Sequence, residues 1–287
     1  MRPGTVSKIL WHFTGGLMWD QETNKQLDKL KPTKDGFDAL KSILDSREIR
    51  VGSYKEVVKV VVPERITYKR IKGTKTRERI VEKNLEYTLY SSPVCCVADI
   101  PIQHLAYHSK RYGKIAIGFR REAVINAGFN PVMYSMENSN LVNLVHDGIE
   151  ELSNITADNA QSAFDDYESD VEGLFRDEEI DFTSPSNWVE AELDNIVSEI
   201  ASVKDNYKEL LAYIKTFDET EFDSIYCERE WRSTSPFSFN LSDLAFIILP
   251  RNDIEGNFYK DFLDNHVDSL KIPKEVIIAS WEDLIEH

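Results

Sequence analysis

KIAIGF, residues 114–119, is the stretch that decides the fold class, because it is short, apolar and rich in β-branched and aromatic side chains. This composition is typical of a central strand in a sheet. A second stretch of the same kind, SKILWHFT at residues 7–14, predicts a buried strand near the N-terminus. The two stretches therefore predict a sheet at the centre of the protein.

Predicted helices and further strands follow these two stretches in an irregular order. Residues 15–33 are mostly polar and open with two glycines, which predicts a loop. Further strands are predicted at residues 49–51, 94–98, 132–135, 224–232, 244–249 and 276–279, and helices at 36–46, 101–111 and 256–270. Because strands and helices do not alternate regularly, a doubly wound parallel sheet is disfavoured. We predict an α+β fold with a mixed or antiparallel sheet.

Two segments with opposite charge interrupt this core. Residues 57–70 and 79–90 predict a basic hairpin around a polar turn at residues 72–75, with one solvated or anion-binding face. Residues 140–217 are strongly acidic and carry helical spacing, which predicts a helical insertion.

The predicted division is therefore into three parts. Residues 1–139, with the hairpin at 57–90, and residues 218–287 form the two parts of the α+β core, and residues 140–217 form the insertion.

The overall composition excludes several classes of protein. The net charge of −16 disfavours non-specific binding to nucleic acid or to an anionic membrane. No apolar run approaches the ~20 residues that a membrane span needs. Three cysteines without a CxxC pair disfavour a disulfide framework or a zinc site. The expected location is the cytoplasm, and the oligomeric state stays open.

Familiar motifs for nucleotide or metal chemistry are absent from the sequence. There is no GxGxxG, GxxxxGK[ST], HExxH or GxSxG. His104 and His108 are four residues apart on one predicted helix, but no third ligand is near in sequence, so we expect two ordinary histidines. No metal site is expected.

A dense charge cluster, residues 228–232 (EREWR), is the most distinctive chemical feature. On a strand, Glu228, Glu230 and Arg232 would share one face. Burying such charges costs several kcal/mol each unless they are paired, and neighbouring carboxylates raise one pKa, which suits acid–base chemistry. The alternative is an edge strand on which an ion pair to Arg232 is purely structural.

His12 stands at the end of the first predicted strand, in the sequence His-Phe-Thr-Gly-Gly. Imidazole and hydroxyl groups both donate and accept hydrogen bonds, so His12 and Thr14 suit recognition of a ribose or an amide. The alternative is a core histidine whose ring is satisfied by the backbone. Asp99, just before a predicted helix at Pro101, is expected to cap that helix.

Three sets of segments together resemble a known family. They are residues 12–14 with 42–44, residues 94–101 with His108 and 112–119, and residues 230–232 with 246–250. The sequence resembles the AbiGi family of bacterial abortive-infection proteins, which confer resistance to phage. This resemblance implies a phage-defence role in which the protein is an antitoxin.

The same layout also resembles ADP-ribosyltransferases, including DarT-like toxins, and implies a core of that type with NAD as substrate. By this resemblance His12 and Thr14 would bind NAD. Tyr90, Tyr112 and Arg232 would complete the NAD-binding set.

The catalytic group implied by this second resemblance is a glutamate on a late strand. Glu230 would be catalytic and Glu228 would orient the acceptor. Cleavage of the nicotinamide bond builds positive charge on the ribose, which a fixed carboxylate stabilises.

Two functions therefore compete. One is an NAD-dependent, ADP-ribosyltransferase-like effector that modifies a protein or nucleic-acid acceptor. The other is a non-enzymatic antitoxin that binds its cognate toxin, with the acidic residues 140–217 as the binding surface for a basic partner. A third, disfavoured by the negative charge, is a nucleic-acid enzyme that uses the basic hairpin.

Overall fold

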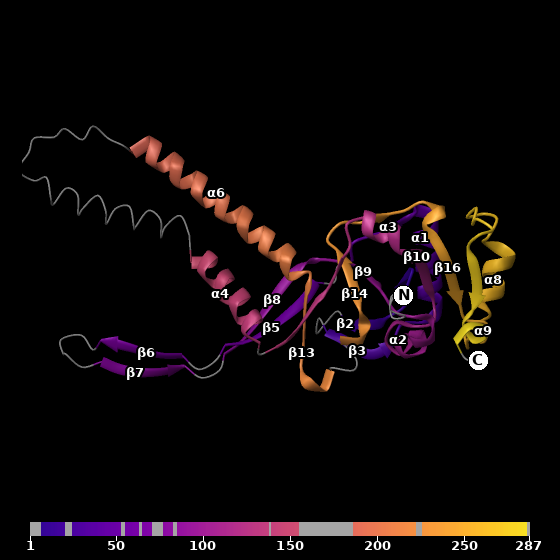
Figure 1. Cartoon of the computed structure of the whole chain (residues 1–287), viewed down its shortest axis with the longest axis horizontal. Helices are drawn as coiled ribbons and strands as arrows, with labels where there is room; N and C mark the ends of the chain where they lie inside the picture. The colour runs from indigo at the N-terminus through magenta and orange to yellow at the C-terminus, as the bar shows by residue number, and fades with distance from the viewer. Residues whose placement is uncertain are drawn as a thin grey trace, which may run out of the picture. The chain divides into compact units, whose positions relative to one another are not determined.

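The computed structural model describes residues 7–20, 25–52, 55–62, 65–70, 77–82, 85–137, 139–154, 186–221 and 226–285. The chain divides into two compact units, which are described separately (Figure 1). Unit 1 comprises Met1–Lys55, Pro93–Tyr134 and Phe217–His287, and unit 2 comprises Glu56–Ser92 and Ser135–Thr216. The three-part division predicted from the sequence stays a prediction.

A seven-stranded sheet forms the centre of unit 1. Five of its six neighbour pairs are antiparallel, and the pair β16–β17 is parallel. The order across the sheet is β11 (Asn130–Pro131), β14 (Glu230–Ser233), β9 (Cys95–Ala98), β1 (Ile9–Phe13), β10 (Ala116–Arg120), β16 (Leu244–Leu249) and β17 (Ile277–Ser280). The predicted α+β class with a mixed sheet is confirmed, and both KIAIGF and SKILWHFT supply strands near the middle of the sheet.

Apolar side chains cover both faces of this sheet, because alternate residues of each buried strand point to opposite sides. On one face, Leu10 and Ile117 pack with residues of α1 (Thr33–Ser46), α3 (Arg121–Asn126) and α8 (Phe258–Asn265). On the other face, Trp11 and Ala116 pack with residues of α2 (Leu105–Tyr112) and α9 (Trp281–Ile285). Helices on both faces therefore enclose the central strands.

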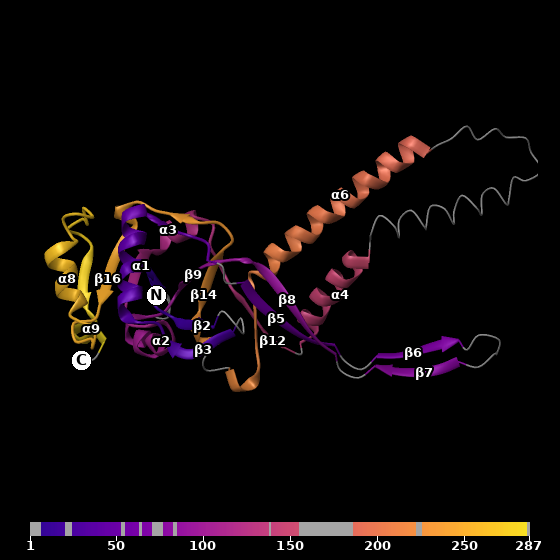
Figure 2. The ribbon, with the colours of Figure 1, turned by 180° about the vertical axis from the view of Figure 1, so that it is seen from behind.

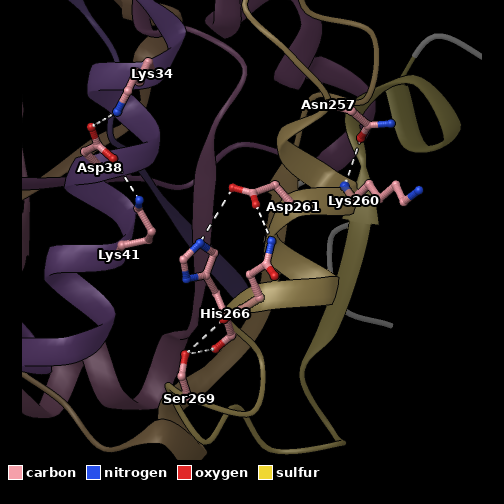
Figure 3. A network of polar contacts seen from close by, with 9 residues as sticks. Lys34, Asp38, Lys41, Asn257, Lys260, Asp261, His266 and Ser269 are labelled. Carbon is pink, nitrogen blue, oxygen red and sulfur yellow. Dashed lines mark hydrogen bonds and ion pairs between the residues drawn. The ribbon is translucent and has the colours of Figure 1, made fainter.

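The helices follow their sequence signals closely, with one exception. Phe37, Leu40 and Leu44 are buried as predicted, and α1 ends at Arg47, whose φ of 55° is left-handed. Helix α8 begins after Asn257, whose side chain accepts a hydrogen bond from the Lys260 N–H at 2.9 Å (Figure 3). The prediction of a helix over 256–270 is too long, because α8 ends at Asn265 and turns follow it.

Exposed ion pairs lie on the surface of the first turns of α1. Asp38 lies 2.6 Å from the Lys34 Nζ and 2.8 Å from the Lys41 Nζ (Figure 3). These hydrogen bonds, from Lys34 first, lower the pKa of the Asp38 carboxyl to about 2. The carboxylate is therefore charged at any physiological pH.

The predicted loop at residues 15–33 is wrong in part. It contains β2 (Leu17–Asp20) and β3 (Lys25–Leu30), which pair with each other in an antiparallel ribbon. Leu27 and Leu30 are exposed, so the ribbon is formed without the one-sided apolar burial that makes a strand visible in sequence. A further two-stranded pair joins β4 (Glu48–Ile49) to β15 (Phe237–Ser238).

Unit 2 contains the hairpin and the long helices (Figure 2). β5 (Lys55–Val62) pairs with β8 (Leu85–Pro93), and β6 (Arg65–Arg70) pairs antiparallel with β7 (Arg77–Glu82). This pairing confirms the predicted hairpin, whose turn at residues 72–75 lies outside the described residues. The ribbon β12 (Met133–Met136) with β13 (Ile214–Phe217) lies at the boundary of the two units in sequence.

Two described helices confirm the helical spacing of the acidic segment, α4 (Asn140–Asn154) and α6 (Ser186–Leu211). Val142 and Leu211 from these helices pack with Val58 and Val60 of β5 in a small core. Among the described helices of the whole chain, none is long and apolar enough to span a membrane.

Candidate functional site

Three adjacent strands of unit 1 bring the early histidine toward the late glutamates. Ala98 of β9 pairs with Trp11 of β1 on one side and with Glu230 of β14 on the other. Directly paired residues point to the same face, so alternation assigns Glu230 to the face of Trp11 and His12 to the opposite face. In the described residues, Trp11–Ala98 is the one pair joining β1 to β9, and His12 follows directly where the pairing ends.

The His12 ring is held by the backbone of β9. Its Nδ1 lies 2.9 Å from the Cys96 carbonyl oxygen. Because a carbonyl only accepts, Nδ1 must carry the proton and donate it, which leaves the Nε2 lone pair as acceptor. Burial lowers the pKa of the His12 imidazole, and the Cys96 hydrogen bond opposes this shift in part. The ring is therefore neutral at pH 7.

Glu230 is held on a buried strand by a buried arginine. The Arg232 Nη2 donates to the Glu230 Oε2 at 2.9 Å, with the Arg232 side chain 0% and the Glu230 side chain 12% exposed. The Glu230 N–H donates to the Tyr134 hydroxyl at 2.8 Å. Burial raises the pKa of the neighbouring Cys96 thiol well above its ordinary value, and the Glu230 charge adds to this effect.

Glu228 reaches the same region from a turn and not from the strand. The predicted strand over 224–232 is confirmed for residues 230–232, which belong to β14, and is wrong for residues 226–228, which form a 3-10 helix. Residues 224–225 lie outside the described residues, and the predicted alternation of Glu228 and Glu230 on one strand is wrong. Arg229 between them has a left-handed φ of 45°, which breaks the extended backbone. The Tyr112 hydroxyl donates to the Glu228 Oε1 at 2.9 Å.

Asp99 is an anchor for arginines and not the expected helix cap. Its Oδ2 accepts from the Arg229 Nη2 at 3.1 Å, and its Oδ1 lies 2.8 Å from the Arg121 Nη2. The helical turn after Pro101 begins without a side-chain cap. The predicted capping role is therefore wrong, because stronger charged partners take both carboxylate oxygens.

A cavity of about 100 Å³ lies between these side chains. Its lining includes four of the predicted site residues, His12, Tyr112, Glu228 and Glu230, together with Cys96. The structure therefore brings both predicted carboxylates, the predicted histidine and one predicted aromatic ring to a single hollow. Drug-sized ligands occupy about 300–1,000 Å³, so this hollow by itself accepts only a small group.

A second hollow of about 380 Å³ shares three lining residues with the first, His108, Tyr112 and Glu228. Its other lining residues include the basic Lys110 and Arg111. The Arg111 Nη1 lies 3.6 Å from the Glu228 Oε1, so the arginine faces the same carboxylate.

Three predicted site residues have other roles or places in the structure. The Thr14 hydroxyl donates to the Gly36 carbonyl at 2.7 Å, which ties β1 to α1. Arg232 is fully buried against Glu230, so it supports that carboxylate. Tyr90 belongs to unit 2 and is 60% exposed there.

His108 is a site residue that the sequence did not identify. Its ring stacks on Tyr112 at 4.4 Å between centroids and packs against Phe13 at 4.8 Å. His104, four residues earlier in the sequence, is exposed while His108 is buried, in line with the expectation of two ordinary histidines. The spacing of four residues suggested a pair, whereas α2 begins at Leu105 and leaves His104 in the preceding turn.

One group of potential metal ligands occurs in the described part of the chain, away from these residues in sequence. The ligand atoms of His146, Asp147 and Glu150 on α4 lie within 4.8 Å of one another. The His146 Nδ1 is 3.3 Å from the Asp147 Oδ1, and the Tyr87 ring packs on the imidazole. This geometry is that of a histidine oriented by a neighbouring carboxylate.

Comparison with known proteins gives one family. The family model described as "Putative abortive phage resistance protein AbiGi, antitoxin" matches residues 55–271. A relative from Lactococcus lactis subsp. cremoris, "Abortive phage resistance protein AbiGi", is 24% identical over 198 residues, which cover 67% of this chain and 70% of the relative. No solved structure matches the chain. The family match includes the charge cluster and the acidic helices, and it begins after His12.

Proposed function

The chain belongs to the AbiGi family of abortive phage resistance proteins, and from this premise we propose that it is an antitoxin that restrains a toxin by binding it. The family model describes an antitoxin, which supports the binding function over the enzymatic one. The partner is then a protein, and no cofactor is required for the interaction.

The observation that carries this proposal is the distribution of charge. Residues 140–217 contain 19 Asp and Glu against 4 Lys and Arg, a net charge of −15, and the whole chain has −16. The rest of the protein is therefore nearly neutral. A charge of one sign gathered on one segment attracts a partner of opposite sign and accelerates association. We propose that this segment binds a basic surface of the toxin.

Charge-neutralising variants test the proposal directly. Glu199, Asp205 and Glu209 on α6 are exposed, so changing all three to their amides removes three charges without opening the core. Each exposed charge pair contributes about 0.2–1 kcal/mol, so affinity for the toxin is expected to fall about tenfold. The measurement is co-purification and titration with the protein encoded by the neighbouring gene, together with rescue of growth when both are expressed.

The matched control removes the same charge from unit 1. Glu122, Asp264 and Glu275 are exposed there, and their amide variants leave the chain with the same net charge as the test variant. Affinity is expected to stay at the wild-type value. If both triple variants lose affinity equally, net charge and not the acidic segment governs binding. If the wild-type chain neither binds the toxin nor restores growth, the antitoxin function is wrong.

A second function is favoured by one specific observation, the hollow lined by His12, Tyr112, Glu228 and Glu230. We propose as the alternative an ADP-ribosyltransferase-like activity with NAD as substrate, in which Glu230 stabilises positive charge on the ribose. The arrangement of an imidazole acceptor and a fixed carboxylate around one space supports this chemistry. Against it stand the small volume of that hollow and the engagement of Glu230 by Arg232.

The enzyme hypothesis is tested by NAD consumption and label transfer with purified protein. Glu230→Gln is expected to abolish activity, whereas Glu122→Gln, at an exposed position of α3, is expected to leave it unchanged. No NAD turnover by the wild-type chain, with or without its toxin, would refute the hypothesis.

A further inference from the structure

Among the side chains of α4 and α6 that the structure describes, four large apolar ones are exposed to solvent. Leu144 is 69% exposed and Leu210 is 48% exposed, and Leu141 and Val203 are each 41% exposed. Exposed single leucines are ordinary on protein surfaces, but these four occur within two packed helices of unit 2. Their relative placement therefore decides whether they form one surface.

The two helices run antiparallel where they meet. Val142 shares a core cluster with Leu211, and a Cβ added to Gly148 would lie 2.9 Å from the Tyr207 hydroxyl. The chain leaves along α4 and returns along α6, and the two helices lie side by side (Figure 2). Residues 144 and 210 thus lie at the same level.

Helical geometry places the exposed side chains on the side where the two helices face each other. At about 100° per residue, Leu141 and Leu144 lie within about 40° of Gly148, the residue that approaches α6. On α6, Val203 and Leu210 lie within about 60° of Tyr207, the residue that approaches α4. The four side chains therefore form an apolar seam, which we define as Leu141, Leu144, Val203 and Leu210.

Carboxylates border this seam. Asp147 and Glu151 follow Leu144 by one and two turns on α4, and Glu199 precedes Val203 by one turn on α6. Helix α4 carries three acidic residues and no Lys or Arg, and α6 carries six acidic residues and two lysines. An apolar stripe between acidic borders is complementary to a helix with one apolar and one basic face.

We infer that the apolar seam between α4 and α6 is the docking site for an amphipathic basic helix of the partner toxin. The inference rests on the proposed antitoxin function and names the surface and the chemistry of the partner. Leucines of the incoming helix would cover Leu144 and Leu210, and its lysines or arginines would meet the acidic borders. Apolar contact supplies most of the affinity, whereas the charges select the partner and its orientation.

The test uses the full chain and a defined probe. The probe is a labelled peptide of about 18 leucine and lysine residues, with leucines at i, i+3, i+4 and i+7, and the control peptide has the same composition in scrambled order. Binding is followed by fluorescence anisotropy. The wild-type chain is expected to bind the patterned peptide at least about tenfold more tightly than the scrambled one.

The variant that removes the seam is Leu144→Ser with Leu210→Ser, and a second is Leu141→Ser with Val203→Ser. Each is expected to weaken binding of the patterned peptide about tenfold or more, since each removes two branched apolar side chains. Leu263→Ser on α8 is the matched control, because Leu263 is also 41% exposed, and it is expected to change nothing. Circular dichroism checks that helix content is retained.

The inference that the seam is a docking site is overturned if the wild-type chain binds both peptides equally. It is also overturned if Leu263→Ser loses as much affinity as the serine variants of the seam. Failure of the seam and failure of the antitoxin function are separable with the toxin itself. If the toxin binds the serine variants as well as the wild type but loses affinity for the amide variants of α6, the seam is wrong and the function stands. If the toxin does not bind the wild type, the function is wrong.

Discussion

Replacing Arg232 by methionine is expected to destabilise unit 1 by about 3–5 kcal/mol. The Arg232 side chain is fully buried and lies 2.9 Å from the Glu230 carboxylate, which is itself 12% exposed. Methionine fills a similar volume but leaves the carboxylate without its cationic partner. The cost of an uncompensated buried charge, and not a loss of packing, therefore sets the magnitude.

The chain contains a matched exposed control with the same spacing. Arg50 also follows a glutamate, Glu48, by two residues, but its side chain is 77% exposed and the pair is 3.7 Å apart. An exposed pair contributes about 0–1 kcal/mol, so Arg50→Met is expected to have little effect. The difference between the two variants isolates the effect of burial on one type of ion pair.

The assay is urea unfolding followed by tryptophan fluorescence, since Trp11 and Trp281 are both buried in unit 1. Adding Glu230→Gln to Arg232→Met removes the orphaned charge and is expected to restore about 1–3 kcal/mol. The reasoning is refuted if Arg232→Met costs no more than Arg50→Met, or if the second substitution adds to the loss in place of offsetting it.

Three further perturbations follow from single contacts. Gly118→Ala places a Cβ 2.8 Å from the Ile9 side chain and 2.9 Å from the Trp11 side chain, so the free energy of unfolding should fall by about 1–3 kcal/mol through overpacking. Urea unfolding measures this loss, and a variant as stable as the wild type would contradict the prediction. Burial lowers the pKa of His12 below 6.5, so as pH falls the unfolded chain takes up a proton at this residue before the folded chain does. The part of the unfolding free energy that depends on a neutral His12 is therefore complete above pH 6.5, and it is lost as pH falls toward the pKa of the folded state. His12→Asn should remove that part of the pH dependence in urea titrations from pH 7 to 5, and an unchanged curve would exclude it. Asn257→Ala removes the cap of α8 and should cost about 1 kcal/mol in thermal unfolding, whereas Asn257→Ser should restore most of it.

The sheet core could be predicted because its strands are short apolar runs and its helices carry one apolar face. β10 is buried at four of its five residues, and the apolar run KIAIGF predicted this burial. By contrast, the ribbon β2–β3 has exposed leucines at Leu27 and Leu30, so its strands leave no apolar pattern. Backbone pairing without burial cannot be read from side-chain periodicity.

The site was predicted less well, because a single backbone angle changes which side chains meet. The alternation of Glu228 and Glu230 assumed an extended chain, but Arg229 is left-handed and is not one of the residue types that favour this region. The ion pair of Arg229 with Asp99 and the hydrogen bond from Asp99 N–H to the Arg229 carbonyl accompany that conformation. Such tertiary contacts have no local signal in the sequence.

A carboxylate that lines a hollow and also meets donors has two explanations, because the same donors that fix a catalytic group also stabilise a structural one. Glu230 shows both features, in the lining of the hollow and in its contact with Arg232. Glu230→Gln separates the explanations when stability and NAD turnover are measured on one preparation. A structural carboxylate predicts lower stability with no turnover to lose, because the buried guanidinium loses its counter-charge. A catalytic carboxylate predicts that turnover is lost while the folded site still binds NAD, because glutamine keeps the shape and removes only the charge that the transition state requires.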